Sequence, residues 1–410
     1  MRARRLAARW LFPIEGSPIE HGAVLVDADG RIQAVGPAAA IPHPENVPSL
    51  AFEDAAILPG FVNTHTHLEL TGFEDQVPIG EFPLWIHQLH QLKLNRTPAD
   101  NLIAAYQGLR DCYAAGVTTV ADTGDSGAVL TALAEVDGSG IVYQEVFGPD
   151  PAQASESLTA LQRRVRELDS CTSSRVRIGV SPHAPYTVSA ALYRSVAGWA
   201  KAQRLPMAVH IAESAAETQF LLSGTGPFAD GWRKRGIPLP SPQGHTPVSW
   251  LAEHGVLAEQ TLCIHAVQVG ARDVQRLAES GAAVAHCPLS NRVHGHGGAP
   301  VRTMLEAGIR VGLGTDSVAS VGRLDLLAEA RAAGQLASLT ADHQLELCTL
   351  GGARALGLDS ETGSLRPGKW ADCTVIRLRA TRGTPSERVL ASSPADVVLT
   401  CVSGRDVYRQ

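Results

Sequence analysis

The first strand candidate in the central part of the chain reads FVNTHTH, residues 61–67. A doubly wound parallel sheet, the rival fold, would follow its first strand with a glycine-rich phosphate-binding turn. Here the strand ends in His65-Thr66-His67 instead. Residues i and i+2 of an extended strand point to the same side, so both imidazoles can reach one place. The stretch therefore favours a barrel with polar groups at its strand ends.

Seven further apolar segments follow and alternate with helical sequence rich in Ala and Leu. The candidate strands close at Val120-Ala121, Val146, Val180, Val209, Ile264, Ala285 and Leu313, and the helical stretches include 100–115, 155–169, 189–204, 271–280 and 324–336. Eight buried strands separated by helices predict an α/β fold, a parallel (β/α)8 TIM barrel. Two connections are long, 68–99 and 213–260, and we expect them to form a roof over the substrate.

The two ends of the chain have strand character. Residues 22–36 read as a hairpin around an Asp-Gly turn, and residues 363–378 and 396–408 are β-like as well. Neither end alone can form a stable sheet, so we expect the two to pair. The predicted domains are a composite β-sandwich of residues 1–57 and 362–410 and a barrel of residues 58–361.

Composition limits the classes of partner. The chain has 410 residues, a net charge of −6 and no long basic run, so nucleic acid is not an expected partner. No stretch approaches the ~20 apolar residues of a membrane span. The seven cysteines are scattered without a CxxC, which predicts reduced thiols in a soluble, cytoplasmic protein. We expect a small-molecule substrate, and a homo-oligomer stays open.

Polar side chains recur where the later strands end. His183, His210, His265, His286 and Asp316 each close or follow a candidate strand. Catalytic groups of barrel enzymes converge from these positions onto one face, whereas a chance placement would put polar groups against an apolar wall. Three of the histidines with Asp316 suit one divalent ion with one bound water, either zinc or another first-row metal.

Several longer motifs extend the pattern. They are HTH at 65–67, SPHAPYTVS at 181–189, HIAES at 210–214, CPLSNRVHGHGGAP at 287–300, GTDS at 314–317 and TGSLRPGKWADCTVI at 362–376. Together they resemble the amidohydrolase superfamily, in its mononuclear deaminase and chlorohydrolase branch. The resemblance covers nearly the whole chain. It implies one divalent metal, zinc or else iron or manganese, held by His65, His67, His210 and Asp316.

The resemblance also implies the roles of other side chains. Glu213 would be the proton shuttle, and His265 and Asp316 would hold and deprotonate the water. His183 would contact the substrate. We add Glu69 as a further substrate contact, with a backbone amide as its alternative partner. His294 and His296, in a Gly-rich segment, are left open between substrate contact and a structural place.

The number of metal ions follows from the lysines. Two-metal relatives bridge their ions with a carboxylated lysine at the end of strand 4. This chain has four lysines, Lys93, Lys201, Lys234 and Lys369, and none lies at such a place. His183 follows strand 4 instead, so we expect one ion.

The activity expected from the resemblance is hydrolytic deamination of an amino-substituted N-heterocycle, an adenine-type compound such as aminofutalosine. A chlorohydrolase or cyclic amide hydrolase is the alternative, and a catalytically inactive scaffold barrel is a remote one. One departure argues against S-adenosylhomocysteine. Deaminases of that compound carry an acidic residue just before the Trp of the first loop, whereas here Leu84 precedes Trp85. Glu81 or Glu69 would have to take its place.

Overall fold

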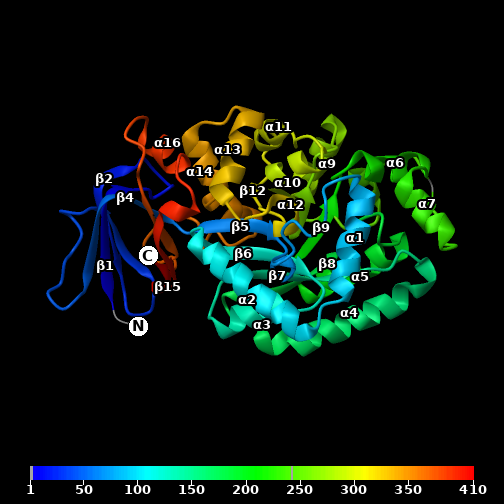
Figure 1. Ribbon diagram of the computed structural model, residues 1–410, viewed down its shortest axis with the longest axis horizontal. Coiled ribbons are helices and arrows are strands. Elements are labelled where there is room, and N and C mark those ends of the chain that lie inside the picture. The colour runs from blue at the N-terminus through cyan, green and yellow to red at the C-terminus, as the bar shows by residue number, and fades with distance from the viewer. Residues whose placement is uncertain (1–2, 242) are drawn as a thin grey trace.

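The structure is a computed structural model that describes residues 3–241 and 243–410. It has two parts, a barrel surrounded by helices and a β-sheet module in which both chain termini lie (Figure 1). The predicted α/β class, the TIM barrel and the β module shared by both chain ends are confirmed.

Eight strands form the barrel in chain order. They are β5 (Phe61–Thr66), β6 (Val117–Gly124), β7 (Gly140–Val146), β8 (Val176–Pro182), β9 (Met207–Ile211), β10 (Thr261–His265), β11 (Ala283–His286) and β12 (Val311–Leu313). The last strand meets the first where the backbone N–H groups of Thr315 and Asp316 both donate to the carbonyl of His65, each at 3.0 Å. This closure places Asp316 beside the two histidines of the first strand.

Helices follow each strand and cover the barrel. They are α2 (Pro98–Ala114), α3 (Ala128–Glu135), α4 (Ala154–Leu168), α5 (Ala190–Gln203), α9 (Ala271–Ser280), α10 (Pro288–Val293), α11 (Val301–Glu306), α12 (Val318–Val321), α13 (Leu326–Ala337), α14 (Ala341–Leu347) and α15 (Leu350–Ala355), with short 3-10 turns η2 (Pro151–Gln153) and η3 (Asp169–Cys171). Their apolar faces and the outer faces of the strands form the largest buried cluster of the molecule. A helix after every strand is the connection that parallel strands require.

The amino-terminal end of the barrel is filled by apolar side chains and by α15. Inner side chains such as Val62 and Leu262 pack with Leu356 just after that helix. A Cβ on Gly312 would lie 2.8 Å from the Cα of Gly352, so the glycines allow α15 to lie directly against β12. The barrel interior is therefore a packed core.

The β module is one mixed sheet of seven strands. Its hydrogen-bonded order is β15 (Arg405–Arg409), β14 (Val397–Val402), β13 (Cys373–Arg377), β4 (Ser49–Pro59), β1 (Arg4–Leu11), β2 (Ile19–Val26) and β3 (Ile32–Pro37), with α16 (Pro385–Leu390) and η4 (Pro394–Asp396) beside it. β4 pairs in parallel with β1 and antiparallel with β13, which joins the two chain ends. Only Gly60 separates β4 from the first barrel strand. The predicted boundaries after residues 57 and 361 stay predictions.

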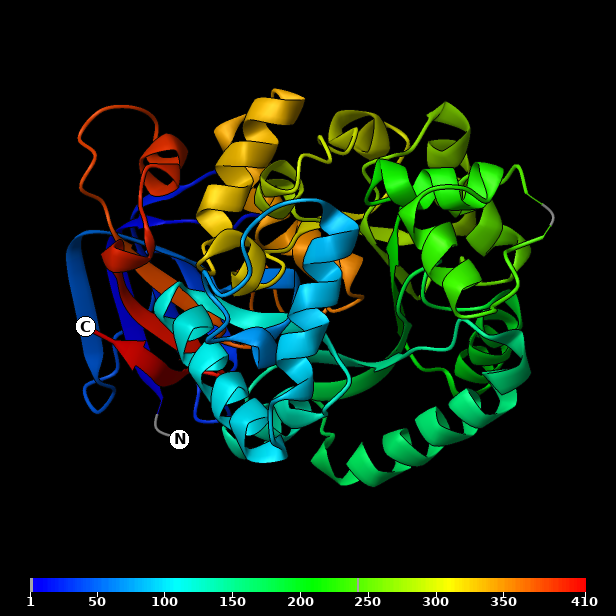
Figure 2. The same ribbon diagram turned by 45° about the vertical axis from the view of Figure 1, so that its right-hand side comes forward.

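The two long connections contain helices. Residues 68–99 form η1 (Leu68–Leu70) and α1 (Phe82–Leu94), and residues 213–260 contain α6 (Ala215–Ser223), α7 (Pro227–Lys234) and α8 (Pro247–Glu253). Figure 2 shows α1 in front of the barrel strands. We call the α-helices of these two connections, α1, α6, α7 and α8, the roof. Among the described residues, no helix has the length and apolar character needed to cross a membrane.

Candidate metal centre and active site

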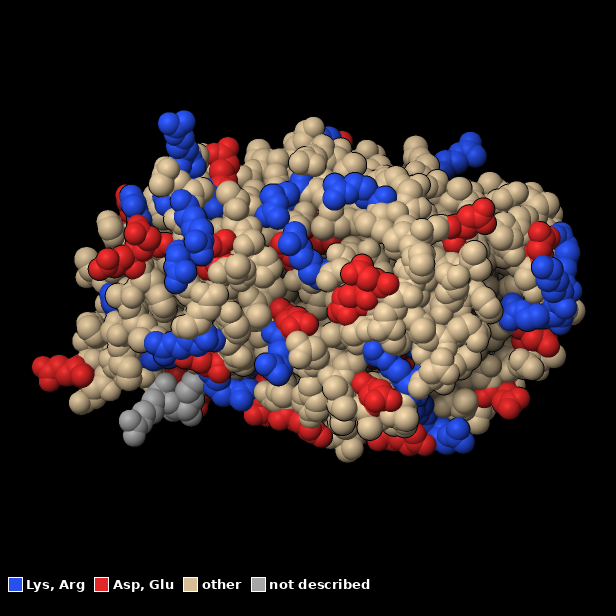
Figure 3. Space-filling view, in the orientation of Figure 1, with Lys and Arg blue, Asp and Glu red and all other residues tan. Residues whose placement is uncertain are grey.

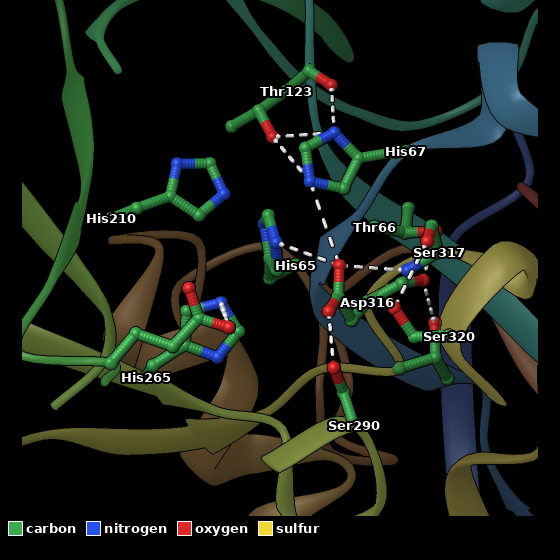
Figure 4. A network of polar contacts seen from close by, with 12 residues as sticks. His65, Thr66, His67, Thr123, His210, His265, Ser290, Asp316, Ser317 and Ser320 are labelled. Carbon is green, nitrogen blue, oxygen red and sulfur yellow. Dashed lines mark hydrogen bonds and ion pairs between the residues drawn. The ribbon is translucent and has the colours of Figure 1, made fainter. Parts of the chain in front are cut away.

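Polar side chains from four strand ends converge on one place. We call the set of His65, His67, His210, His265 and Asp316 the donor ring. Figure 4 shows these side chains turned toward one another, with Asp316 beside His65 and His67. The Nε2 atoms of His65 and His67 lie 3.5 and 3.6 Å from Oδ1 of Asp316. The rings of His65 and His210 have centroids 4.9 Å apart, so the ring of donors is compact.

Two imidazoles of the donor ring are oriented by backbone carbonyls. Nδ1 of His67 donates to the carbonyl of Thr123 at 2.8 Å, and Nδ1 of His210 donates to the carbonyl of His183 at 3.3 Å. With the proton on Nδ1, the lone pair of each ring is on Nε2. Metal-binding histidines use this arrangement, because the second nitrogen fixes both the tautomer and the direction of the ring.

Asp316 is held as a carboxylate. Its Oδ1 accepts from the N–H of Ser317 at 2.8 Å, and its Oδ2 accepts from the hydroxyl of Ser290. Burial favours the protonated form, but the close Nε2 of His65, 3.5 Å from Oδ1, together with the imidazoles of His265 and His67, holds the pKa of Asp316 well below its usual range. Ser290 was not identified from the sequence, since a serine inside a short helix gives no signal of its own.

The donor ring fits a divalent cation. Neither ring nitrogen of His65 has a hydrogen-bond partner among the described residues, although the side chain is fully buried. Burial, with the neighbouring His65, lowers the pKa of His67 to about 4, so this ring is neutral at physiological pH. Metal ligation needs neutral imidazole and ionised carboxylate. The triads His65, His67 and Asp316, and His65, His210 and His265, each keep their donor atoms within 4.8 Å of one another.

The backbone at these strand ends is strained. Ala212, His265 and Asp316 have φ angles of 50°, 73° and 58°, in the left-handed region that favours glycine. Such conformations cost about 1–3 kcal/mol each and persist where the surroundings over-determine them, commonly at functional sites. The strained residues here flank or belong to the donor ring.

Glu213 lies beside the donor ring. Its side chain is 5% exposed, and its Oε1 lies 3.5 Å from Nε2 of His265. Burial, and then the negative charges of Asp316 and Glu217, raise the pKa of Glu213 well above its usual range. No protein group among the described residues donates a hydrogen bond to its carboxyl group. A raised pKa favours the protonated form, so this carboxyl group can act as a proton donor.

Glu217 braces the loop that carries Glu213. Its two carboxylate oxygens accept from the backbone N–H groups of Ala212 and Glu213, at 2.8 and 2.9 Å. The sequence contained a signal for this residue, because Ser214 and Glu217 have the S-x-x-E spacing of a helix start. Ser214 does cap α6, accepting from the N–H of Glu217 at 3.2 Å.

His183 lies at the edge of the donor ring. Its ring centroid is 4.7 Å from that of His210, and its Nδ1 lies 2.8 Å from the hydroxyl of Thr187. Its Nε2 is 3.9 Å from Oε1 of Glu145, a buried side chain that sequence reasoning did not select. The assignment of His183 as a substrate contact stays a prediction.

Glu69 is engaged by protein groups. Oε1 accepts from Nζ of Lys93 at 2.8 Å, and Oε2 accepts from the hydroxyl and the backbone N–H of Ser126. Lys93 also pairs with Asp125 at 2.9 Å, so the lysine joins α1 of the roof to the end of β6. The predicted contact of Glu69 with a substrate also stays a prediction.

Charged groups on the outer surface are mixed. On the face of Figure 3, Lys and Arg are interspersed with Asp and Glu, without one extended patch of either sign. A surface of mixed sign produces little long-range attraction for a charged polymer. Among the described residues, the charged side chains of the candidate site, such as Glu213 and Asp316, are buried instead.

The chain is similar to known proteins along most of its length. The profile of the Amidohydrolase family matches residues 56–407. A 5-methylthioadenosine/S-adenosylhomocysteine deaminase of Moorella thermoacetica is 30% identical over 414 residues, which cover 96% of this chain and 91% of the relative. An adenosine deaminase of Xanthomonas campestris with bound zinc is 25% identical with a TM-score of 0.84, covering 99% of this chain and 93% of that one. Aminofutalosine deaminase of Helicobacter pylori has the same fold, with a TM-score of 0.84 at 22% identity, over 99% of this chain and 100% of its own.

Proposed function

The chain belongs to the Amidohydrolase family, and we propose that within it the protein is a metal-dependent deaminase of an adenine-type heterocycle. The reaction replaces the exocyclic amino group by oxygen: water adds to the amino-bearing carbon, and the carbon–nitrogen bond then breaks to release ammonia. The observation that carries this proposal is the buried carboxyl group of Glu213, placed beside the donor ring without a protein hydrogen bond.

We propose that His65, His67, His210 and Asp316 hold one zinc ion. The unpartnered nitrogens of His65 and the neutral, oriented rings of His67 and His210 support this set. A zinc ion bound there would make a coordinated water acidic enough to ionise near neutral pH. The zinc reported in the Xanthomonas campestris relative favours this metal over iron or manganese.

The protons are handled by three side chains. Asp316 is ionised, and with His265 it can hold the attacking water and accept its proton. The raised pKa of Glu213 favours its protonated form, which can give its proton to the ring nitrogen next to the amino-bearing carbon. The carboxylate that remains can then take the proton of the added hydroxyl group as the carbon–oxygen double bond forms. The proton that Asp316 took from water can pass to the departing nitrogen, so that ammonia leaves and both side chains return to their starting forms. General acid and base groups of this kind contribute about 10²–10⁴-fold in rate.

The roof bears on the substrate class. Phe82 and Trp85 of α1 are buried and present aromatic surface near the site, with the Phe82 ring 4.5 Å from that of His296. The acid expected for binding sugar hydroxyls is not provided by Glu69, whose oxygens are engaged by Lys93 and Ser126. Glu81 is exposed at the start of α1. These contacts do not distinguish aminofutalosine from S-adenosylhomocysteine, because both compounds carry the sugar hydroxyls, so both are tested.

Ammonia release tests the proposal. Purified, metal-replete protein is incubated with aminofutalosine, adenosine, 5'-deoxyadenosine, methylthioadenosine, S-adenosylhomocysteine and guanine, and ammonia is measured enzymatically. We expect release from at least one adenine-type compound, and none from the Glu213→Gln variant on the same time scale. Chloride release from a chlorotriazine without any ammonia release would support the chlorohydrolase alternative instead. Failure to bind zinc would support an inactive scaffold.

We also propose a cytoplasmic location. All seven cysteines are unpaired, and six of them are buried. Cys373 and Cys401 lie directly opposite each other on β13 and β14, a position where an oxidising compartment would favour a disulfide. Fractionation of cells that express the tagged chain, with a cytoplasmic marker as reference, tests the location.

A further inference from the structure

The segment His294-Gly295-His296-Gly297 has no part in the reaction as described so far. It lies between α10 and α11, on the substrate side of the barrel. Gly295 and Gly297 have φ angles of 69° and 96°, so the chain turns sharply on both sides of His296. The two turns present His296 inward from a loop that is otherwise at the surface.

The position of His296 is fixed from three directions. Its backbone N–H donates to the carbonyl of Asn291 at 2.8 Å, and its carbonyl accepts from the side-chain amide of Gln268 at 2.7 Å. The ring meets Phe82 edge to face, with centroids 4.5 Å apart. The imidazole is therefore held by the α10 segment, by the loop after β10 and by the roof.

The free nitrogen of this ring faces Glu213. The His296 side chain is only 6% exposed, and its Nε2 has no hydrogen-bond partner among the described residues. This nitrogen lies 3.7 Å from Oε1 of Glu213, the same oxygen that lies 3.5 Å from Nε2 of His265. Both separations are slightly longer than a hydrogen bond, as is common for catalytic contacts before a substrate closes the site.

Building on the function proposed above, we propose that His296 is a positioning residue for Glu213. Together with His265, it holds Oε1 between two imidazoles, which fixes the plane of the carboxyl group and leaves Oε2 for the ring nitrogen of the substrate. His296 acts through Glu213 and itself needs no contact with the reacting atoms. Two imidazoles from different strand connections hold the carboxyl group more rigidly than His265 alone.

His294 provides a matched comparison. It lies in the same segment, stacks on His296 with ring centroids 5.6 Å apart, and also packs against the roof. Its Nε2, however, lies 3.2 Å from the hydroxyl of Ser320 and not beside Glu213. Loss of His294 should therefore affect the enzyme independently of Glu213.

A double-mutant cycle tests the proposal. We expect His296→Leu to lower kcat about 10- to 100-fold, the usual result of a catalytic group displaced by about 1 Å, with KM and zinc content little changed. His296→Gln, which keeps an amide N–H near the Nε2 position, should recover most of that loss. In the Glu213→Gln background, His296→Leu should lower kcat by less than about threefold, because residues that act as a unit are not additive.

The same pair of backgrounds, with and without Glu213, provides the control and the outcomes that would disprove the role of His296. His294→Leu should cause the same fractional loss with and without Glu213. If His296→Leu also costs the same in both backgrounds, it does not act through Glu213 and the proposal is wrong. Loss of zinc or folding in His296→Leu with no rescue by His296→Gln would equally contradict it.

A measurement without turnover separates this inference from the proposed function. In ¹⁵N-histidine NMR of the zinc-loaded protein, the His296 signals are assigned by their loss in His296→Gln. Glu213→Gln should shift them while leaving those of His254, buried against Trp250, unchanged. Unmoved His296 signals would overturn the inference even if the enzyme deaminates its substrate. A shift in a protein that deaminates nothing would support the contact and count against the proposed function.

Discussion

The donor ring and the roof lie next to each other but are held in different ways. Each member of the donor ring comes from the end of a barrel strand. Three of them, His67, His210 and Asp316, are oriented by hydrogen bonds to backbone groups. The roof is held by side chains, chiefly the pairs of Lys93 with Glu69 and Asp125. Hydrogen bonds to the backbone fix the direction of a side chain closely, whereas ion pairs between long side chains leave conformational freedom. The difference predicts that changes in the donor ring abolish chemistry, while changes in the roof adjust binding and stability.

The largest effect should come from removing a metal ligand. We expect His210→Ala to lose metal and activity together, because its Nε2 is one of the converging donors. Metal per chain is measured by atomic emission and activity by ammonia release. The native protein should hold about one equivalent, as expected for a site with four protein ligands. Full activity in metal-free His210→Ala would disprove the site, and a reproducible second equivalent would contradict the single ion.

Glu213→Gln should separate chemistry from metal binding. The amide keeps the shape of the side chain but cannot give or take the proton, so kcat should fall about 10²–10⁴-fold. Zinc content and melting temperature should match those of the native protein, since Glu213 is not one of the proposed metal ligands. Near-normal turnover would remove Glu213 as the proton shuttle.

Ser290→Ala tests the support behind the donor ring. The hydroxyl of Ser290 donates to Asp316, and loss of such a supporting hydrogen bond commonly costs about 10- to 100-fold in metal affinity or activity. Competition with a zinc-binding dye measures the affinity. Ser320→Ala is the control, because Ser320 contacts His294 instead of Asp316. Equal zinc affinity in Ser290→Ala and the native protein would show that Asp316 needs no such support.

Lys93→Met should have the smallest effect on activity. It leaves Glu69, whose side chain is 2% exposed, without its cation, while the lysine itself is 23% exposed. We expect the free energy of unfolding to fall by about 2 kcal/mol, a value between the losses typical of exposed and of fully buried ion pairs. kcat/KM should fall less than about tenfold, mainly through KM, because the looser roof binds substrate less well.

The control for that variant is on the same helix. Leu84 of α1 is 54% exposed, and Leu84→Gln should change the free energy of unfolding by no more than about 0.5 kcal/mol. Urea unfolding measures both variants. A collapse of kcat in Lys93→Met with KM unchanged would mean that the roof takes part in the chemistry, against the contrast drawn between it and the donor ring.

The sequence predicted what strand geometry determines. His65 and His67 are two residues apart on a strand, and barrel closure brings the end of the last strand, with Asp316, to the same place. Both facts follow from general rules for strands and barrels. The barrel, the β module and the family were predicted correctly for the same reason, because their signals are periodic or belong to contiguous motifs.

What the sequence could not predict depends on contacts between distant side chains. His296 faces Glu213 only because two glycines turn its loop and Phe82 of the roof packs on its ring. Ser290 meets Asp316 across two strand connections. Glu69 was expected to face substrate, and its pairing with Lys93 depends on where α1 lies. Neither spacing nor composition encodes such positions.

The place of β4 in the middle of the terminal sheet has a consequence during synthesis. β4 is complete at Pro59, yet the strand that pairs with its free edge begins at Cys373. At a translation rate of about 5–20 residues per second, that edge stays unpaired for a time on the order of tens of seconds. Until then the nascent chain displays an unpaired strand edge, the usual starting point of aggregation. The module therefore closes last, and loss of the final strands would leave the first ones exposed.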